Sequence, residues 1–467
     1  MKKGEMSLLE NINKIHFVGI GGAGMSAIAK ILVEKKYIVS GSDLHGSELV
    51  EKLKAQGAKI FQGHCPKNVE GVDAIVVSTA ISEDNPEVVA AKQAGVKIFH
   101  RSDIVAALMN SASGIAVAGA HGKTTTTSML AVVLDNAGVS PTIIIGGEVD
   151  YLGSNAKLGQ GKYLVAEADE SDGSFLKLLP KIAVVTNIEN DHMDHYGSME
   201  NIRKAFRQFL QNLPKEDGLA VLCFDNENIR DIAKISDRRY ISYAIEHKAD
   251  YQAVDIHTDV DGTSFDVVHD GENLGRIVLK VPGCHNVLNA LAATAVSLEL
   301  GLSLKQVAAG FSYFHGAKRR FQTKGKIDGV WVVDDYAHHP TEISTTLKAA
   351  KQTKPQRVIC AFQPHRYTRT QLLQKEYGSC FAEADLLVLT NIYSAGESPI
   401  EGIDGETIVK EVKKQTGQNV VYIEKEEDVA PYLKTIVQKG DLVLSMGAGT
   451  IYRSGEQLVA LLQEAES

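Results

Sequence analysis

Two glycine-rich junctions, each between an apolar run and an amphipathic stretch, constrain the fold of this chain more than any other feature. The first spans residues 19–24 (Gly-Ile-Gly-Gly-Ala-Gly) and follows the apolar run at 15–18. The second spans residues 119–124 (Gly-Ala-His-Gly-Lys-Thr) and follows the apolar run at 114–118. At a strand-to-helix junction, glycines let the backbone approach a phosphate, while unpaired N–H groups and the helix dipole favour its negative charge. Two such loops predict that the chain brings two phosphorylated molecules together.

Short β-branched runs alternate with amphipathic stretches along the whole chain, which predicts parallel sheets wrapped by helices. With 467 residues, about three domains are expected. We predict an α/β fold of three domains: a Rossmann-like N-terminal domain at 1–110, a central P-loop ATPase-type domain at 111–314 and a Rossmann-like C-terminal domain at 315–467. Period-two alternation at 250–279 predicts a small antiparallel insert in the central domain.

Composition excludes several classes of protein. The chain is 44% hydrophobic, and no stretch approaches the roughly 20 apolar residues of a membrane span, so no membrane insertion is expected. The five cysteines form no Cys-x-x-Cys pair and predict neither a disulfide framework nor a thiolate zinc site, which favours the cytoplasm. The net charge of −9, with no basic stripe, argues against nucleic-acid binding. We expect a cytoplasmic monomer or homodimer.

The loop at 19–24, hereafter the glycine loop, has two interpretations. Gly19, Gly21 and Gly24 match the dinucleotide fingerprint, and Asp43 lies about twenty residues on, where a ribose-binding acid is expected. This pattern favours an NAD(P)-dependent oxidoreductase. A UDP-sugar presents the same pyrophosphate flanked by sugars, so the motif leaves both ligands open.

The loop at 119–124, hereafter the lysine loop, resembles a P-loop, although the strict pattern needs glycine at position 117, where this chain has Val117. Its backbone N–H groups can hold phosphates, Lys123 can reach the β and γ oxygens, and Thr124 can bind Mg²⁺. Glu167 and the segment 187–192 each follow a predicted strand and therefore lie at the same sheet edge. Carboxylates there are natural magnesium ligands, whereas a histidine ligand is unusual and a helix-capping loop remains an alternative for His192.

Five motifs together closely resemble the Mur ligases. They are residues 119–124, the run Glu-Ala-Asp-Glu-Ser-Asp at 167–172, the segment 187–194, Gly-Cys-His-Asn at 283–286 with Asn289, and Asp-Tyr-Ala-His-His-Pro at 335–340. The resemblance extends from Gly19 to at least Gly449. It implies an ATP- and Mg²⁺-dependent amide synthesis that joins L-alanine to UDP-N-acetylmuramate in peptidoglycan precursor synthesis. A ligase of cell-wall recycling, which joins a whole tripeptide to the same sugar nucleotide, is the nearest alternative within the family.

The resemblance also implies a role for individual residues. The UDP-sugar would be bound by Gly21, Gly22, Ala23, Gly24, Ser42, His64, Ser78 and Arg101. ATP would be bound by Gly119, His121, Gly122, Lys123, Thr124, Thr125, Asn286, Asn289, Arg320 and Asp335, and magnesium by Thr124, Glu167 and His192. The amino acid would be bound by Tyr336, His338, His365, Arg366 and Arg369. The catalytic set would be Lys123, Glu167, His192, Arg320 and His338.

One departure from the family pattern concerns the metal site. Several Mur ligases carry a carbamate-modified lysine roughly fifteen residues after the metal histidine, and this chain has Arg207 there, with Lys204 nearby. The departure argues against a second, carbamate-bound magnesium.

Of the other classes, an oxidoreductase leaves Lys123, Thr124 and Glu167 without a function, and an ATP-gated regulatory module leaves the second phosphate loop unexplained.

Overall fold

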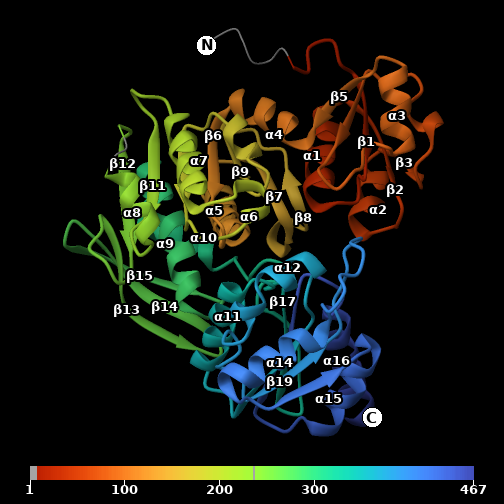
Figure 1. Cartoon of the computed structure of the whole chain (residues 1–467). Helices are drawn as coiled ribbons and strands as arrows, with labels where there is room; N and C mark the ends of the chain where they lie inside the picture. The colour runs from red at the N-terminus through yellow and green to blue at the C-terminus, as the bar shows by residue number, and fades with distance from the viewer. Residues whose placement is uncertain (1–7, 235–236, 467) are drawn as a thin grey trace. The chain divides into compact units, whose positions relative to one another are not determined.

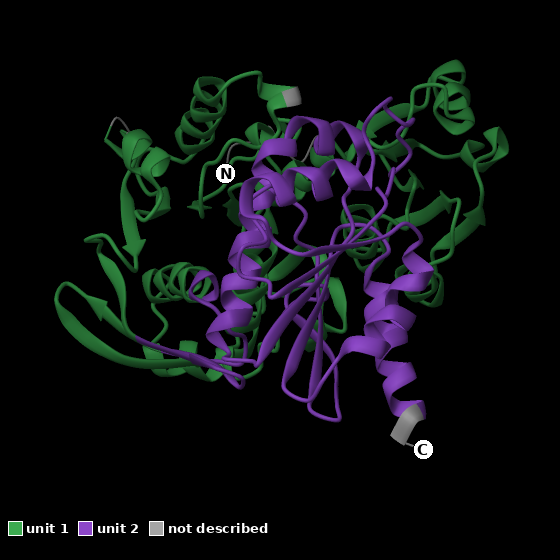
Figure 2. Cartoon of the chain, turned by 60° about the horizontal axis from the view of Figure 1, so that its bottom comes forward, with its two compact units in different colours: residues 1–255, 265–278, 287–315 green, residues 256–264, 279–286, 316–467 purple. Residues whose placement is uncertain are grey.

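The computed structural model describes residues 8–234 and 237–466. Within these residues the strands form sheets of five, ten and six strands, which confirms the predicted α/β class (Figure 1). The chain divides into two compact units (Figure 2). Unit 1 comprises residues 1–255, 265–278 and 287–315, and unit 2 comprises residues 256–264, 279–286 and 316–467. The three predicted domain ranges contain one sheet each and stay predictions, and their outer ends at 1 and 467 lie outside the described residues.

The N-terminal sheet is parallel, with strand order β3-β2-β1-β4-β5. Its strands are β1 Lys14–Val18, β2 Ile38–Asp43, β3 Lys59–Gln62, β4 Ala74–Val77 and β5 Lys97–His100. Its helices are α1 Ala23–Glu34, α2 Glu48–Ala55, η1 Pro66–Val69, α3 Pro86–Gln93 and α4 Arg101–Asn110. The chain order of the strands reverses at β1, and ligands bind at the carboxyl ends of the strands at such a point. The glycine loop leaves β1 at that end.

The central sheet has the order β15-β14-β13-β12-β11-β10-β6-β9-β7-β8. Its strands are β6 Ser113–Ala118, β7 Thr142–Val149, β8 Ser154–Lys157, β9 Tyr163–Glu167, β10 Ile182–Val185, β11 Leu219–Cys223, β12 Tyr240–Ala244, β13 Tyr251–Asp259, β14 Gly262–His269 and β15 Glu272–Leu279. Its helical elements are α5 Lys123–Asn136, η2 Asp150–Leu152, η3 Ser174–Lys177, α6 Met193–Tyr196, α7 Met199–Gln211, α8 Glu227–Ala233, α9 Cys284–Glu299 and α10 Leu304–Phe311. Because β6 lies between β9 and β10 and is parallel to both, the segments after these three strands meet at one edge.

Two features of this sheet follow directly from the sequence. Strands β13, β14 and β15 are consecutive neighbours with links of only two residues, which permit antiparallel pairing alone and confirm the predicted insert. Helix α5 is buried continuously from Thr126 to Leu134, so the last two of its four threonines lie inside the protein, whereas Thr124 and Thr125 are half-buried. Gly310 on α10 packs so closely that a Cβ there would lie 2.6 Å from Val133 Cα.

The C-terminal sheet lies in unit 2 and has the order β16-β17-β21-β18-β19-β20, parallel except for β16. Its strands are β16 Gln322–Ile327, β17 Val330–Asp335, β18 Arg357–Phe362, β19 Leu386–Thr390, β20 Val420–Ile423 and β21 Asp441–Met446. Its helices are α11 Pro340–Gln352, α12 Tyr367–Leu372, α13 Gln374–Tyr377, α14 Gly405–Thr416, η4 Glu426–Asp428, α15 Val429–Ile436 and α16 Tyr452–Glu466. Alternate residues of β18 enter two different apolar clusters, so both faces of the sheet are covered. No helix among the described residues of the chain is long and apolar enough to cross a membrane.

Candidate active site

Backbone and side-chain contacts from β2 hold the glycine loop. The N–H groups of Gly19 and Ile20 donate to the carbonyl oxygen of Ser42 at 2.8 and 3.0 Å. The N–H of Gly21 donates to Asp43 Oδ2 at 2.9 Å. Asp43, which the fingerprint assigns to a ribose, therefore shapes the loop itself.

Two positions of the lysine loop require glycine, because of their backbone conformation and their close neighbours. Gly119 has a φ of +134° and Gly122 a φ of +83°, both in the range that favours glycine. A Cβ on Gly119 would collide with Thr186 Oγ1, and a Cβ on Gly122 would lie 2.6 Å from Asn289 Oδ1. The loop thus leaves no room for side chains at these two positions.

Residues that follow β10 fix the backbone of His121. Its N–H donates to Asn187 Oδ1 at 2.8 Å, and its carbonyl oxygen accepts from Asn187 Nδ2 at 2.9 Å and from Thr186 Oγ1 at 2.6 Å. The side chain of His121 pairs with Glu189, with 3.2 Å between Nε2 and Oε2. The lysine loop is therefore anchored to the neighbouring strand end predicted from the sequence.

The amine of Lys123 lies within the curve of its own loop. Its Nζ donates to the carbonyl oxygens of Gly119 and Ala120 at 2.6 and 3.3 Å and to Glu170 Oε1 at 2.8 Å. Burial favours loss of the proton, but the carboxylates of Glu170, Asp169 and Glu167 outweigh it and raise the pKa of Lys123. Lys123 is therefore a fixed cation. Glu170, which is 3% exposed, was not singled out by the sequence reasoning.

Thr124 and Glu167 form a pair of oxygen donors at the strand edge. Thr124 Oγ1 donates to Glu167 Oε2 at 3.1 Å, and Glu167 Oε1 accepts from the N–H of Gly146 at 2.7 Å. Thr125 follows in the same first turn of α5. A hydroxyl and a carboxylate suit Mg²⁺, which takes few protein ligands and fills its remaining positions with phosphate and water oxygens. The donor set fits a nucleotide-bound magnesium.

His192 lies beside a different carboxylate. Its Nε2 is 3.6 Å from Glu170 Oε1 and 3.5 Å from Asp191 Oδ2, and its φ of +56° is in the left-handed region. Burial opposes protonation, but Glu170 and Asp191 raise the pKa of His192. No group of three or more His, Cys, Asp or Glu residues that could hold a metal ion occurs in the described part of the chain. A magnesium site here therefore depends on oxygen atoms that the nucleotide and water bring.

Arg101 links the two phosphate loops within unit 1. Its Nη2 donates to Asp169 Oδ2, and its Nη1 lies 3.1 Å from the position that a Cβ on Gly24 would occupy. Burial favours the neutral acid, but Arg101 and Lys123 lower the pKa of Asp169. An arginine beside the glycine loop is thus connected, through one ionised carboxylate, to the surroundings of the lysine loop. Asp169 is a second residue that the sequence reasoning missed.

The other sugar-nucleotide candidates lie at the carboxyl ends of the N-terminal strands. Ser42 is in β2, and Ser78 directly follows β4. His64 follows β3, and its Nδ1 lies 3.0 Å from Ser42 Oγ. Both Ser42 and His64 contact Glu87, a fully buried carboxylate that no sequence motif marks.

In helix α9, Asn289 contacts the lysine-loop helix. Its Oδ1 accepts from Thr126 Oγ1 at 3.1 Å. Asn286, one turn earlier, donates from Nδ2 to the carbonyl oxygen of Pro282 at 2.7 Å. Burial, together with the charge of Arg320, lowers the pKa of His285, the residue before Asn286, to about 4.

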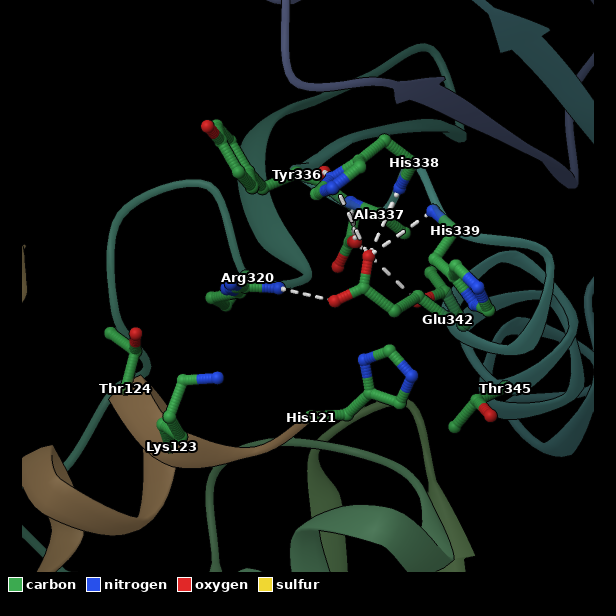
Figure 3. Close-up of polar contacts among 12 residues, drawn as sticks. His121, Lys123, Thr124, Arg320, Tyr336, Ala337, His338, His339, Glu342 and Thr345 are labelled. Atoms are coloured by element: carbon green, nitrogen blue, oxygen red, sulfur yellow. Dashed lines mark hydrogen bonds and ion pairs between the residues drawn. The ribbon is translucent and has the colours of Figure 1, made fainter. Parts of the chain in front are cut away.

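In unit 2, Glu342 organises the segment after β17 (Figure 3). Its Oε2 accepts from the N–H groups of His338 and His339 at 3.1 and 3.3 Å, and its Oε1 lies 3.6 Å from Arg320 Nη1. The guanidinium of Arg320 lies over the ring of Tyr336, 5.3 Å from its centroid. One carboxylate therefore fixes both the predicted phosphate-binding arginine and the histidine segment.

The carboxylate of Asp335 is buried in unit 2 and accepts hydrogen bonds from the backbone. Its Oδ2 accepts from the N–H of Phe321 at 2.7 Å and its Oδ1 from the N–H of Ala337 at 2.8 Å. Burial outweighs these bonds and the charge of Arg320 and raises the pKa of Asp335 to about 6. These contacts give Asp335 a part in shaping the loop, and its predicted nucleotide contact stays a prediction.

The histidines and arginines of the predicted amino-acid site lie together in unit 2. The rings of His338 and His365 are 5.9 Å apart between centroids, and Arg369 Nη1 lies 3.2 Å from His365 Nδ1. Burial lowers the pKa of His338 to about 4, and burial with the nearby arginines lowers that of His365 to about 3. Arg366, with a φ of +69°, donates its N–H to the carbonyl oxygen of Tyr393 at 2.8 Å. Neutral imidazoles and arginine cations thus share one small region.

Comparison with known proteins identifies the family. Family models match residues 14–113 (Mur ligase family, catalytic domain), 117–297 (Mur ligase middle domain) and 319–449 (Mur ligase, glutamate ligase domain). A UDP-N-acetylmuramate–L-alanine ligase of Geotalea daltonii is 50% identical over 454 residues, which cover 97% of this chain and 99% of that protein. This chain belongs to the Mur ligase family. The predicted family is confirmed, and the NAD(P)-dependent oxidoreductase that the glycine loop left open is excluded.

Solved structures of Mur ligases resemble this one along almost the whole chain. A UDP-N-acetylmuramate-alanine ligase of Thermotoga maritima has a TM-score of 0.83 and 31% identity, covering 97% of this chain and 99% of that one. A murein peptide ligase of Psychrobacter arcticus has a TM-score of 0.72 and 25% identity, covering 96% and 98%. The three-part α/β architecture is that of the family, and the ligase uses ATP.

Proposed function

We propose that this Mur ligase joins L-alanine to UDP-N-acetylmuramate in cytoplasmic peptidoglycan precursor synthesis. The observation that carries the proposal is the 50% identity, over nearly the full length of both chains, to a ligase with that name. The two phosphate loops of unit 1 support it, because one suits the diphosphate of a sugar nucleotide and the other the triphosphate of ATP. The higher identity and TM-score of the alanine ligase, compared with the murein peptide ligase, favour a single amino acid over a tripeptide.

In this proposal, unit 1 binds both phosphorylated substrates. The glycine loop from Gly21 to Gly24, with Ser42, His64, Ser78 and Arg101, binds the sugar nucleotide. The lysine loop binds ATP through the backbone of Gly119, His121 and Gly122 and through Lys123 and Thr125, and Asn289 supports the loop. Thr124 and Glu167 hold magnesium, which when bound neutralises phosphate charge. His192 keeps a predicted metal role, although its contact with Glu170 supports a part in positioning that carboxylate.

Residues of unit 2 and of helix α9 complete the assignments. Asn286, Arg320 and Asp335 are proposed nucleotide residues. Tyr336, His338, His365, Arg366 and Arg369 are proposed for the amino acid, since an arginine pairs bidentately with a carboxylate. The low pKa of His338 and of His365 keeps both imidazoles neutral at pH 7, so that they can accept a hydrogen bond from an ammonium group.

The chemistry proceeds in two steps. A carboxylate oxygen of the lactyl group attacks the γ-phosphorus of ATP, ADP leaves, and an acyl phosphate forms. Lys123 and Arg320 neutralise the charge that moves onto the phosphate oxygens. The deprotonated amine of L-alanine then attacks the acyl carbon, the C–O bond to phosphate breaks, and the amide, inorganic phosphate and one proton are released.

An acceptor comparison tests this function. The chain is supplied with ATP, Mg²⁺ and UDP-N-acetylmuramate, and L-alanine, L-serine, glycine or the stem tripeptide is added in turn. We expect the highest kcat/KM with L-alanine, measured by ADP release and by the mass of the product. A higher kcat/KM with the tripeptide would instead support the recycling ligase, and release of ADP without an amide would contradict both.

A further inference from the structure

A fully buried carboxylate in unit 1 has no part in the assignments above. Glu87 lies in the first turn of α3 and is 0% exposed. Its Oε2 accepts from Ser42 Oγ at 2.5 Å and lies 3.0 Å from His64 Nδ1. Its Oε1 accepts from Asn68 Nδ2 at 2.5 Å and from the N–H of Cys65 at 3.3 Å, and His16 Nε2 lies 3.5 Å away. Groups from β1, β2, η1 and the segment after β3 thus converge on one carboxylate.

These contacts keep Glu87 ionised. Burial alone favours the neutral acid, but hydrogen bonds from His16, Ser42 and Asn68 lower the pKa of Glu87 to about 2. A buried charge is costly unless polar partners surround it, and an apolar side chain of similar size would fill the same space without that cost. We therefore infer that the carboxylate of Glu87 holds the surrounding polar groups in fixed positions.

One of those groups connects Glu87 to the glycine loop. Ser42 holds the loop through its backbone carbonyl, which accepts from Gly19 and Ile20, and its hydroxyl is held by Glu87. A displacement of Ser42 would move the start of the loop with it. Because Asp43, the next residue, holds Gly21, the position of β2 at this point sets the shape of the whole loop.

The second group is the imidazole of His64. Since Glu87 can only accept, the hydrogen bond fixes the proton on His64 Nδ1 and leaves Nε2 for another partner. The side chain of His64 is 14% exposed, whereas that of His16, on the other side of the carboxylate, is 0% exposed. Of the two histidines that contact Glu87, His64 is therefore the one with access to a ligand.

We propose that Glu87 is a positioning residue for the sugar nucleotide, which fixes Ser42, His64 and the start of the glycine loop in the geometry that binds the diphosphate end. The inference rests on the proposed function, because it assigns that ligand to the glycine loop. It adds a residue that touches no substrate and acts through two residues that do.

The test replaces the charge while keeping the size, with Glu87→Gln in the full chain. Outer partners that orient metal-binding histidines change metal affinity by about 10- to 100-fold, and by analogy we expect the KM for UDP-N-acetylmuramate to rise about tenfold. The KM values for ATP and L-alanine should stay within about twofold. Glu83→Gln is the matched control, since Glu83 is 93% exposed and pairs with Lys92 on the surface; it should leave all three KM values unchanged.

A double-mutant cycle separates positioning from simple loss of fold. If Glu87 acts through His64, the combined variant Glu87→Gln/His64→Ala should raise the KM for the sugar nucleotide by about as much as the larger single change, rather than by the product. Should Glu87→Gln fail to fold, Ser42→Ala removes one link alone and should give the same selective rise. Equal rises in the KM for ATP, no rise at all, or fully multiplicative effects would overturn the inference. Failure of the unaltered chain to use UDP-N-acetylmuramate would instead overturn the proposed function.

Discussion

The amine of Lys123 contacts two carbonyl oxygens of its own loop and the carboxylate of Glu170, so its position is fixed before any phosphate is considered. A cation held in this way stabilises a developing phosphate charge without having to be reoriented during the reaction. The short chain of contacts from Lys123 through Glu170 to His192 explains why these three residue types occur together.

Replacing Lys123 by alanine tests this role. We expect turnover to fall at least about 10²-fold, the scale seen when a preorganised charge donor is lost. Steady-state ADP release at saturating substrates measures the effect. Lys204→Ala, at an exposed position of α7, is the control and should retain full turnover. Turnover of the Lys123 variant close to that of the unaltered chain would contradict the role.

Gly122 offers a second prediction at a single residue. Gly122→Ala places a Cβ 2.6 Å from Asn289 Oδ1 at a φ of +83°, so we expect both a loss of stability of about 1–2 kcal/mol and a rise in the KM for ATP. Gly138→Ala has nearly the same φ, +80°, but its Cβ meets no atom within 4 Å among the described residues. Thermal unfolding and ATP kinetics of the two variants separate the cost of the backbone conformation from the cost of the overlap with Asn289. Equal KM values for ATP in both variants would show that the close approach of Gly122 to Asn289 does not affect ATP binding.

At the scale of elements, most strands with buried apolar runs could be predicted, whereas several short strands at sheet edges could not. The buried runs of β1, β6, β9 and β18 stand out in the sequence because helices cover both faces of a parallel sheet. The strands that the sequence reasoning missed include β3, β5, β8 and β16, all at sheet edges. Several of these carry polar or half-exposed residues, so they lack the apolar pattern on which the prediction depends.

The candidate site divides in the same way. Residues at the end of a strand or at the start of the helix that follows, such as Glu167, Lys123 and Thr124, could be found because strand, loop and helix signals coincide there. Glu87 could not, since its partners are distant in the sequence; Glu87 and Ser42 are 45 positions apart. The local capping box of Glu342 gives no sign of its ion pair with Arg320, which precedes β16. Asp43 and Asp335 were expected at ligands, which stays a prediction, and the structure adds that each carboxylate holds a nearby loop.

The start of α11 is an element whose cap also serves the site. Glu342 completes a capping box with His339 and pairs with Arg320, so Glu342→Ala should cost about 1 kcal/mol of stability and also raise the KM for ATP. Asp404→Ala removes a capping box of the same kind at α14, without an arginine of the site. We expect it to lower stability to a similar extent with unchanged kinetics. If both variants left the kinetics unchanged, Glu342 would have a structural role alone.

For the whole molecule, the pKa shifts in unit 2 predict how stability depends on pH. His285, His338 and His365 have pKa values of about 4, 4 and 3, below the usual 6.5, so the unfolded chain binds more protons as the pH falls from 6.5 towards 4. Their contribution to stability is fully present above pH 6.5 and is lost on acidification. Asp335, with its pKa raised to about 6, acts in the opposite direction, as its contribution is lost when the pH rises through 6.

Burial also raises the pKa of Asp334, so three histidines oppose two aspartates, and we expect unit 2 to be less stable at pH 5 than at pH 7. Trp331, the single tryptophan of the chain, lies in β17 and reports the unfolding of unit 2 by fluorescence. The urea midpoint should be lower at pH 5, and His365→Asn should reduce the difference between the two pH values. A midpoint that is higher at pH 5 would show that Asp334 and Asp335 dominate.

The central claim is that a sugar-nucleotide carboxylate is activated by ATP, through two phosphate loops that belong to one compact unit. The most direct measurement uses UDP-N-acetylmuramate with ¹⁸O in both carboxylate oxygens, followed by mass spectrometry of the released phosphate. If the carboxylate attacks the γ-phosphorus, each phosphate formed together with an amide carries one ¹⁸O atom, and the other remains in the amide carbonyl. Unlabelled phosphate released together with the amide would contradict the account.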